Sequence, residues 1–296
     1  MHKIQDKIVL ITGGAQGIGK LLGHKCLQEG AKALVIWDLN SELLHQTTED
    51  FRAEGYTVHP YQVDVSQVHE IEAQAARVLN EVGRIDLLFN NAGIVVGKLF
   101  KEHQASDIDR TLQINVAGVM HVARVFLPAM LEAGAGHIIN IASASSLTPN
   151  PKMSVYAASK WAVLGWSESL RLELEREGKD LHVTTVLPSY INTGMFTGVK
   201  APLITPILDP EYISREIIRA VKNNQILLLA PWSVQLLPIL RGILPTRVFD
   251  FVGGTLFGIY DTMANFIGRT QTSQSPEAEK PAQNGKARRK TPANPA

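Results

Sequence analysis

The sequence predicts an α/β fold in which helices cover both faces of one parallel sheet. Short runs of β-branched and other apolar residues alternate with longer segments of helical period along residues 8–230. A strand that returns to its sheet through a helix makes a right-handed crossover, so this alternation predicts a doubly wound sheet. With 45% hydrophobic and 19% charged residues, the 296-residue chain can bury a core of this size.

The strands are predicted first, from apolar runs that lack polar alternation. Such runs are typical of strands buried on both faces. Seven are found, at Ile8–Thr12, Ala33–Trp37, Val58–Val63, Ile85–Asn90, His137–Ser143, His182–Leu187 and Ile226–Ala230.

Six helices are predicted between these strands, at Gly19–Glu29, Ser41–Glu54, Val68–Val82, Asp107–Ala133, Val155–Glu177 and Glu211–Asn223. Gly30 is expected to end the first helix, because glycine is common just after a helix C-terminus. Ser41 is the expected N-cap of the second helix.

Composition divides the chain into a core at residues 1–230, an apolar extension at 231–268 and a basic tail at 269–296. The tail holds six Lys/Arg and two Glu and lacks large apolar residues, which predicts disorder. The rest of the chain has a net charge of −3, which argues against nucleic-acid binding.

The extension is interrupted by Arg241, Arg247, Pro238 and Pro245. It predicts either amphipathic helices lying on a membrane surface or a lid over the core or a partner subunit.

Several features predict a cytoplasmic protein that is not secreted. Met1–Lys7 is short and polar, unlike a signal peptide, and no uninterrupted apolar run reaches the ~18 residues of a spanning helix. Cys26 is the only cysteine, so no internal disulfide forms. The histidines lack metal-ligand spacing, and we expect no metal site.

A glycine-rich turn, Thr12-Gly-Gly-Ala-Gln-Gly-Ile-Gly19, joins the first predicted strand to the first helix. Gly13 permits a tight turn, Gly17 lets the backbone approach a pyrophosphate, and Gly19 allows close helix–strand packing. Gln16 and Ile18 belong to the same turn. A helix N-terminus favours phosphate charge, so the turn predicts a Rossmann-like domain that binds a dinucleotide.

Asp38 ends the second strand about twenty residues further on, as expected of the residue that binds the adenosine ribose. Its carboxylate accepts hydrogen bonds from ribose hydroxyls and repels a 2′-phosphate. Leu39 and Asn40 follow, and neither they nor Gln16 is basic. We therefore predict NAD in preference to NADP.

Tyr156 and Lys160 are four residues apart in a predicted helix and therefore share one face. The lysine ammonium is expected to lower the pKa of the tyrosine phenol, ordinarily near ~10, towards working pH. Ser143 lies upstream and can hold a substrate oxygen. The three residues predict proton transfer beside the bound dinucleotide.

Together these motifs resemble the short-chain dehydrogenase/reductase family over residues 5–230. The matching positions are Thr12–Gly19, Asp64-Val65, Asn90–Gly93, Asn115, Ser143, Tyr156–Lys160 and Pro188–Thr193. The resemblance implies that Tyr156 is the acid/base, that Ser143 orients the substrate and that Lys160 binds the nicotinamide ribose. It also implies that Asn115 holds a water next to Lys160. Ser189 replaces the glycine that usually follows Pro188.

The same resemblance implies the remaining contacts to the cofactor. Asp64 and Val65 lie at the adenine, Asn91, Ala92 and Gly93 line its ribose, and Pro188, Ile191 and Thr193 meet the nicotinamide side.

Finer similarities point to the retinol and hydroxysteroid dehydrogenases that attach to membranes or lipid droplets. They occur at Trp37-Asp38, Asn91–Val95, Gly97-Lys98, Phe126–Met130, Asn192–Phe196 and Pro206–Pro210. This similarity implies a lipophilic alcohol substrate, such as a retinoid, hydroxysteroid or long-chain alcohol. It also implies a homodimer or homotetramer. A soluble reductase of small or acyl carbonyls and a non-catalytic scaffold at a lipid surface remain alternatives.

Overall fold

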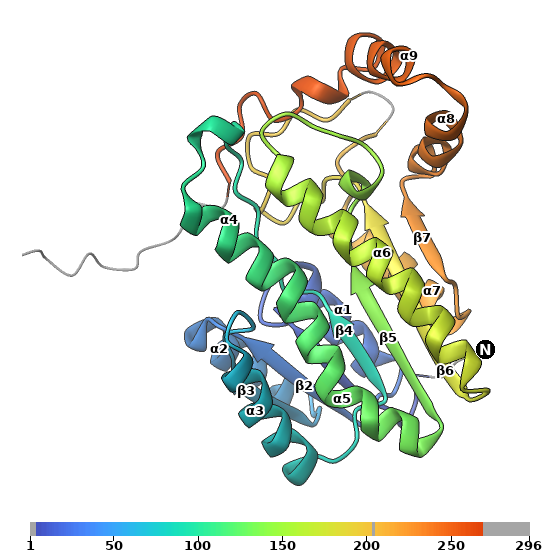
Figure 1. Ribbon diagram of the computed structural model, residues 1–296. Coiled ribbons are helices and arrows are strands. Elements are labelled where there is room, and N and C mark those ends of the chain that lie inside the picture. Colours follow the sequence, from blue (N-terminus) through green and yellow to red (C-terminus); the bar gives the residue numbers. More distant parts are fainter. Residues whose placement is uncertain (1–3, 203–204, 269–296) are drawn as a thin grey trace, which may run out of the picture.

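A seven-stranded parallel sheet forms the centre of the computed structural model, which describes residues 4–202 and 205–268 (Figure 1). The strand order is β3-β2-β1-β4-β5-β6-β7, and every neighbouring pair is parallel. The predicted doubly wound sheet is therefore confirmed. The strands are β1 Ile8–Thr12, β2 Ala33–Asp38, β3 Val58–Gln62, β4 Leu87–Asn90, β5 Ala135–Ile141, β6 Asp180–Pro188 and β7 Leu227–Ala230.

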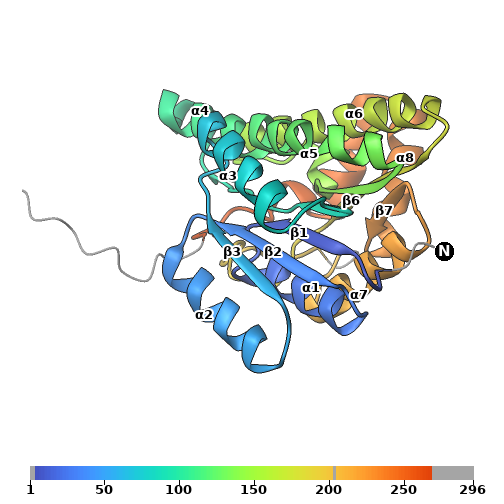
Figure 2. The ribbon, with the colours of Figure 1, turned by 90° about the horizontal axis from the view of Figure 1, so that it is seen from below.

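Helices cover both faces of the sheet (Figure 2). One layer holds α1 Gly17–Gln28, α2 Ser41–Ala53 and α7 Pro210–Lys222. The other holds α3 Val68–Glu81, α4 Ala105–Leu112, α5 Val119–Ala133 and α6 Ser154–Arg176.

Strands β1, β2, β4 and β5 alternate their side chains between two hydrophobic clusters, one under each helical layer. In β1, Val9 and Ile11 pack in the same cluster as Leu22 of α1, whereas Leu10 packs in the cluster that contains Phe126 of α5. Both faces of these strands are therefore buried, which explains why β1 and the start of β2 are apolar along their length.

The second helix is capped by Asn40 and not by Ser41, so the predicted cap is wrong by one residue. The Asn40 side chain accepts a hydrogen bond from the Leu43 amide at 2.9 Å, which places Ser41 inside the first turn. A cap must reach an amide two or three residues ahead, and Asn40 has that geometry.

The helix predicted at Asp107–Ala133 begins at Ala105 and contains a π-helical turn at Gln113–Gly118. A Cβ on Gly118 would lie 2.5 Å from the Val65 carbonyl, so the turn approaches the β3–α3 connection closely. By length and composition, Ala105–Ala133 is the one helical stretch in the described residues that could cross a membrane. Its buried residues Val122, Phe126 and Met130 pack in the core against the sheet.

The strand predicted to run to Ser143 ends at Ile141. Ser143 instead caps a 3₁₀ turn at Ala144–Ser146, accepting a hydrogen bond from the Ser145 amide at 3.2 Å. This turn leads the chain away from the sheet edge and towards α6.

The extension at 231–268 folds into short helical segments beyond the carboxyl ends of the strands (Figure 1). They are Trp232–Leu236, α8 Leu237–Ile243, α9 Thr246–Asp250, a π-helical turn at Phe251–Leu256 and Ile259–Asp261. Val234, Leu237 and Phe249 are buried against Leu147 and Leu229. The predicted tail at 269–296 lies outside the described residues.

Candidate active site

A cavity of about 260 Å³ opens at the carboxyl end of the sheet and is lined by residues that follow β1 and β4. These strands are neighbours at the point where the strand order reverses, which is where doubly wound proteins bind ligands. The cavity brings together all the predicted site residues except Asn115. They are Gly13, Gln16, Gly17, Ile18, Gly19, Asp38, Asp64, Val65, Asn91, Ala92, Gly93, Ser143, Tyr156, Lys160, Pro188, Ile191 and Thr193.

Thr12 and Asn91 hold the ends of β1 and β4 together beneath this cavity. The Thr12 hydroxyl accepts from the amides of Asn91 and Ala92, both at 3.0 Å. The Asn91 side-chain amide donates to the carbonyls of Thr12 and Gly13, at 2.9 and 3.0 Å. The two loops that line the cavity are thus fixed to each other.

The glycine-rich turn has the backbone geometry that its sequence predicts. Gly13 and Gly17 have φ values of +64° and +57°, a region that glycine adopts without strain. A Cβ on Gly19 would lie 2.2 Å from the Gly13 carbonyl oxygen, so only glycine fits there.

The N-terminus of α1 has no side-chain cap and no acidic residue in its first turn. The α2 and α7 helices, in contrast, are capped by Asn40 and Asp209 and carry Glu42 and Glu211 in their first turns. The first amides of α1 therefore remain available for an anion. This part of the cavity fits the pyrophosphate of a dinucleotide.

Asp38 is 7% exposed, and its carboxylate is held by two backbone amides at the cavity wall. One oxygen accepts from Ala15 and the other from Asn40, each at 3.0 Å. The carboxylate is therefore fixed in position and still carries lone pairs for a ligand hydroxyl.

Tyr156 and Lys160 lie one turn apart on α6, and both are buried. The Lys160 ammonium lies 5.8 Å from the centroid of the Tyr156 ring and donates to the Ile141 carbonyl at 2.8 Å. Ser143 lines the same cavity as Tyr156, and its hydroxyl acts to lower the pKa of the phenol. The structure thus joins the three predicted catalytic residues at the cavity.

The pKa values at this site are governed by burial. Burial raises the pKa of Tyr156 above its ordinary value, and the hydrogen bond with Ser143 lowers it by less. Burial also lowers the pKa of Lys160 to about 8. The lowered tyrosine pKa predicted from Lys160 is therefore wrong for the protein alone, because burial disfavours the charged phenolate.

Asn115 lies in the π-helical turn, behind the cavity wall. Its side chain accepts from the Ile94 amide at 2.8 Å and donates to the Ile94 carbonyl and the Ser159 hydroxyl, at 2.9 and 3.1 Å. A Cβ on Gly93 would lie 3.2 Å from Asn115 Oδ1 and 3.5 Å from Lys160 Nζ. The Asn115 side chain thus clamps the loop after β4, close to Lys160.

Several residues that line the cavity were not among the predicted site residues. Phe196 stacks edge-on against Tyr156, with ring centroids 6.2 Å apart, and Arg110 of α4 reaches the same cavity. Phe196 falls within the segment similar to the retinol and hydroxysteroid dehydrogenases, so that similarity could have singled it out. No local signal distinguishes Arg110 from other surface arginines.

A second cavity, of about 70 Å³, adjoins the first, and the two share Ser143, Ser189 and Phe196. The second cavity continues under the extension, where Val234, Leu237 and Ile259 line it. The extension thus covers the side of the site away from Asp38.

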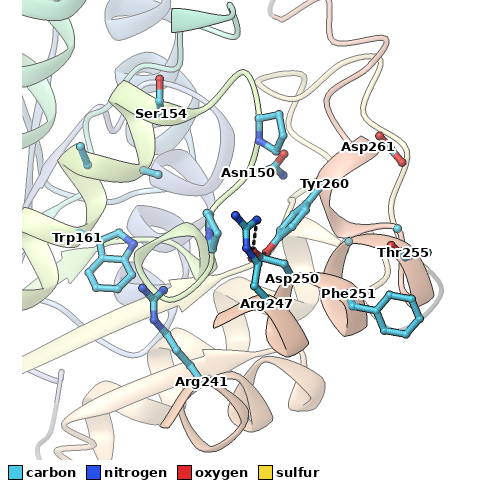
Figure 3. A pocket seen from close by; sticks show the side chains of 16 residues that line it. Asn150, Ser154, Trp161, Arg241, Arg247, Asp250, Phe251, Thr255, Tyr260 and Asp261 are labelled. Atoms are coloured by element: carbon cyan, nitrogen blue, oxygen red, sulfur yellow. Dashed lines mark hydrogen bonds and ion pairs between the residues drawn. The ribbon is translucent and has the colours of Figure 1, made fainter. Parts of the chain in front are cut away.

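A more open groove of about 1200 Å³ separates the start of α6 from the outer part of the extension (Figure 3). The Arg241 guanidinium lies 4.4 Å from the centroid of the Trp161 ring. Across the groove, Asp250 accepts from Tyr260 at 2.8 Å and pairs with Arg247 at 4.0 Å. Among the described residues, no group of three or more His, Cys, Asp or Glu could hold a metal ion.

Comparison with known proteins assigns the family. The short chain dehydrogenase family model matches residues 7–203. Mouse epidermal retinol dehydrogenase 2 is 36% identical over 90% of this chain and 87% of its own length. Rat estradiol 17-beta-dehydrogenase 11 is 32% identical over 89% of this chain and 88% of its own length.

Solved structures agree with this result. A short chain dehydrogenase/reductase from Burkholderia phymatum in complex with NAD has a TM-score of 0.74 at 28% identity, covering 84% of this chain and 95% of its own. A metagenomic short-chain oxidoreductase in complex with NADP has a TM-score of 0.66 at 26% identity, covering 77% and 97%. The chain belongs to the short-chain dehydrogenase/reductase family and is an oxidoreductase of the alcohol dehydrogenase/reductase type.

Lys160→Met should raise the free energy of unfolding at pH 7, because burying the ammonium lowers its pKa from 10.5 to about 8. At ~1.4 kcal/mol per pH unit, that cost is about 3 kcal/mol. The cost is fully present below pH 8, where both states are protonated. It disappears as the pH rises towards 10.5, because the folded state loses its proton first.

Urea unfolding at pH 7 and pH 10 measures this effect, and the gain should shrink by about 2 kcal/mol between the two. Lys101→Met, at an exposed position, is the control and should change stability by less than about 0.5 kcal/mol. An equal change at both pH values would contradict the buried-charge explanation.

Proposed function

We propose that this protein is an NAD-preferring oxidoreductase that interconverts a lipophilic alcohol and its carbonyl. The observation that supports this most strongly is that Asp38 and the trio Ser143, Tyr156 and Lys160 line one cavity. Asp38 selects a dinucleotide without a 2′-phosphate. Ser143, Tyr156 and Lys160 carry out proton transfer. The names of the relatives, which include retinol and estradiol dehydrogenases, support a lipophilic substrate.

Each part of the dinucleotide is matched to a group of residues that line the cavity. Gly13, Gln16, Gly17, Ile18 and Gly19 hold the pyrophosphate at the free amides of α1. Asp38 binds the adenosine ribose, and Asp64 and Val65 meet the adenine, with Asn91, Ala92 and Gly93 beside them. Pro188, Ile191 and Thr193 hold the nicotinamide side, and Lys160 binds its ribose. When bound, the dinucleotide supplies hydride exchange.

Tyr156 exchanges a proton with the substrate oxygen. Its raised pKa keeps the phenol protonated at neutral pH, ready to donate to a carbonyl that is being reduced. In the oxidation direction the phenol must first lose its proton, so this direction should become faster as the pH rises. The Ser143 hydroxyl donates to the same substrate oxygen and stabilises its developing charge.

Lys160 acts on Tyr156 through its charge. With a pKa of about 8, its ammonium is protonated at neutral pH and lies close enough to the Tyr156 ring to favour the phenolate. Asn115 positions the loop after β4 beside this lysine. We also propose that Asn115 holds a water next to Lys160, as the family resemblance implies.

Tyr156→Phe should remove turnover while leaving the fold and NADH binding in place. A positioned acid/base contributes roughly 10²- to 10⁴-fold to the rate, so kcat should fall by at least 10²-fold. Absorbance of NADH with retinol and hydroxysteroids gives the rate, and NADH fluorescence gives binding. Tyr212→Phe, on the exposed side of α7, is the matched control. Full activity of Tyr156→Phe would rule out the assigned role.

Asp38→Ser should reduce the preference for NAD over NADP. Without the carboxylate, a 2′-phosphate no longer meets a fixed negative charge, and a loss of 1.4 kcal/mol corresponds to about tenfold. The ratio of kcat/KM for NAD to that for NADP is therefore expected to fall about tenfold or more. Asp50→Ser removes an equal charge from the exposed surface of α2 as a control. An unchanged ratio would show that Asp38 does not set the preference.

The outer face of the extension is proposed to contact a lipid surface. Eight of the eighteen exposed large hydrophobic residues in the described structure lie within 231–268. They are Trp232, Leu236, Ile239, Ile243, Val248, Phe251, Leu256 and Ile267. Arg247, with its side chain 97% exposed, lies among them, as expected of a helix resting on headgroups. The inner face acts as the lid, so the two sequence-based interpretations describe opposite faces of one segment.

The pair of substitutions Ile243→Glu and Phe251→Glu should abolish this contact. Each buried apolar side chain contributes about 1.5–3 kcal/mol, so the paired loss should reduce vesicle binding at least tenfold. Flotation with phosphatidylcholine vesicles, with and without phosphatidylserine, measures binding. Leu172→Glu, at an exposed position of α6, is the control. Wild-type protein that stays in the soluble fraction would refute membrane contact. The homodimer or homotetramer that the family resemblance implies stays a prediction.

A further inference from the structure

The described part of the extension ends in a strap, residues 262–268, which lies against the segment at 194–200 that follows β6. Backbone hydrogen bonds join the two. They run from the Lys200 amide to Thr262, at 3.1 Å, and from the amides of Ile267 and Gly268 to Thr197, at 2.9 and 3.3 Å. The strap therefore holds a segment that carries Met195 and Phe196, both of which line the first cavity.

The segment has a glycine where the strap comes closest. Gly198 has a φ of +87°, a region that other residues rarely adopt. A Cβ at this position would lie 2.0 Å from the Asn265 carbonyl oxygen of the strap. No side chain fits between the two backbones, so this close approach depends on glycine.

The strap also places the half-buried ring of Phe266 on Gly97, in the loop between β4 and α4. A Cβ on Gly97 would lie 2.1 Å from Cδ1 and 2.3 Å from Cε1 of the ring, so the ring rests on the glycine backbone. In Figure 1 the end of the extension, drawn in red, runs beside this loop. Gly97 belongs to a sequence similarity that the catalytic residues leave unexplained, and the contact with Phe266 gives a physical reason for it.

Phe266 belongs to a group of apolar side chains gathered around Tyr156. Together with Val95, Tyr190 and Phe196, it packs against a buried cluster of Met153, Tyr156, Val199 and Met263. The Phe196 ring lies edge-on to Tyr156 and to Tyr190, with centroids 6.2 and 5.2 Å apart. Phe196 lines both the first and the second cavity, so its ring forms part of the wall where the two meet.

Polar contacts fix the start of the strap. The Thr262 hydroxyl accepts from the Asn150 amide at 2.7 Å, and Lys152 donates to the Ala264 carbonyl at 2.9 Å. Asn150 and Lys152 belong to the loop that leads to α6, the helix that carries Tyr156. Phe266 thus reaches Gly97 from a base that is tied to the catalytic helix.

We propose that Phe266 is a positioning residue for the substrate side of the site. Resting on Gly97, it keeps the strap closed on the segment at 194–200 and so holds Phe196 beside Tyr156. Phe266 is not among the described residues that line either cavity, so it acts through Phe196 and not by touching the substrate. The inference rests on the proposed function, because it assumes a lipophilic alcohol that extends from Tyr156 along Phe196.

Phe266→Ala should raise KM for the retinol or hydroxysteroid that the full chain turns over by about tenfold. Without the ring, Phe196 is no longer held, and the loss of one apolar contact to the substrate corresponds to about that factor. The change should leave kcat within about threefold, because Ser143, Tyr156 and Lys160 are all retained. NADH binding, measured by fluorescence, should be unchanged. A merely structural role would instead lower the melting temperature and leave KM as it is.

Gly97→Ala tests the same contact from the other side. The φ of Gly97 is not left-handed, so alanine is hindered there by the Phe266 ring, which the methyl group must displace. KM should therefore rise as it does in Phe266→Ala. In the double variant the ring is absent and the methyl group has room. KM should then equal that of Phe266→Ala alone and not the product of the two single effects.

Phe100→Ala and Gly242→Ala are the matched controls. Phe100 is 66% exposed, and a Cβ on Gly242 of α8 would meet nothing within 4 Å. Both variants should keep the KM and kcat of the unmodified chain.

Hydrogen exchange gives a readout that needs no turnover. The Lys200 amide is bonded to the strap through Thr262, so its exchange reports whether the strap is closed. In Phe266→Ala this amide should exchange at least about tenfold faster, whereas the amides of α7 should be unchanged.

The possible failures are distinguishable. An unchanged KM in Phe266→Ala, or effects of the two substitutions that multiply in the double variant, would overturn the positioning role and leave the proposed dehydrogenase intact. A parallel loss of NADH binding would also overturn it, because the defect would then be general. Absence of turnover with every alcohol and its carbonyl would refute the proposed function. Unchanged exchange at Lys200 would then refute the strap as well.

Discussion

The candidate active site depends on the hydrogen bonds between Thr12 and Asn91, which join the loops that follow β1 and β4. The sheet reverses its strand order between β1 and β4, so the two loops that follow these strands diverge and leave a crevice. The Thr12 hydroxyl and the Asn91 amide tie the loops together at its floor. Asn115 then fixes the next residues of the β4 loop through Ile94. The glycine turn and the surroundings of Lys160 therefore share one rigid frame.

The buried charge of Lys160 lowers the stability of the folded protein but places an ammonium group beside Tyr156. A charged group inside a protein is costly unless it is paired, and the described partner of Lys160 is one neutral carbonyl, that of Ile141. The same burial raises the pKa of Tyr156. The two residues thus hold a protonated phenol beside an ammonium group that has a lowered pKa. The fold supports this arrangement because strands buried on both faces supply a large apolar core.

The extension at 231–268 contributes apolar side chains both to the second cavity and to the protein surface. Its inner face supplies Ser233, Val234 and Leu237 to the wall of the second cavity. Its outer face leaves large apolar side chains exposed. A single segment therefore forms the end of the substrate site and the surface proposed to meet a lipid layer.

The sequence by itself determined the parallel sheet, the dinucleotide turn and the residues from Ser143 to Lys160, because these depend on local periodicity and short motifs. Only the tertiary structure decided that Asn40 caps α2, that α4 and α5 are joined by a π-helical turn, and that burial raises the pKa of Tyr156. It alone brought Asn150 to Thr262, 112 residues away in the chain. Desolvation and hydrogen-bond partners come from distant segments, and no local pattern encodes them.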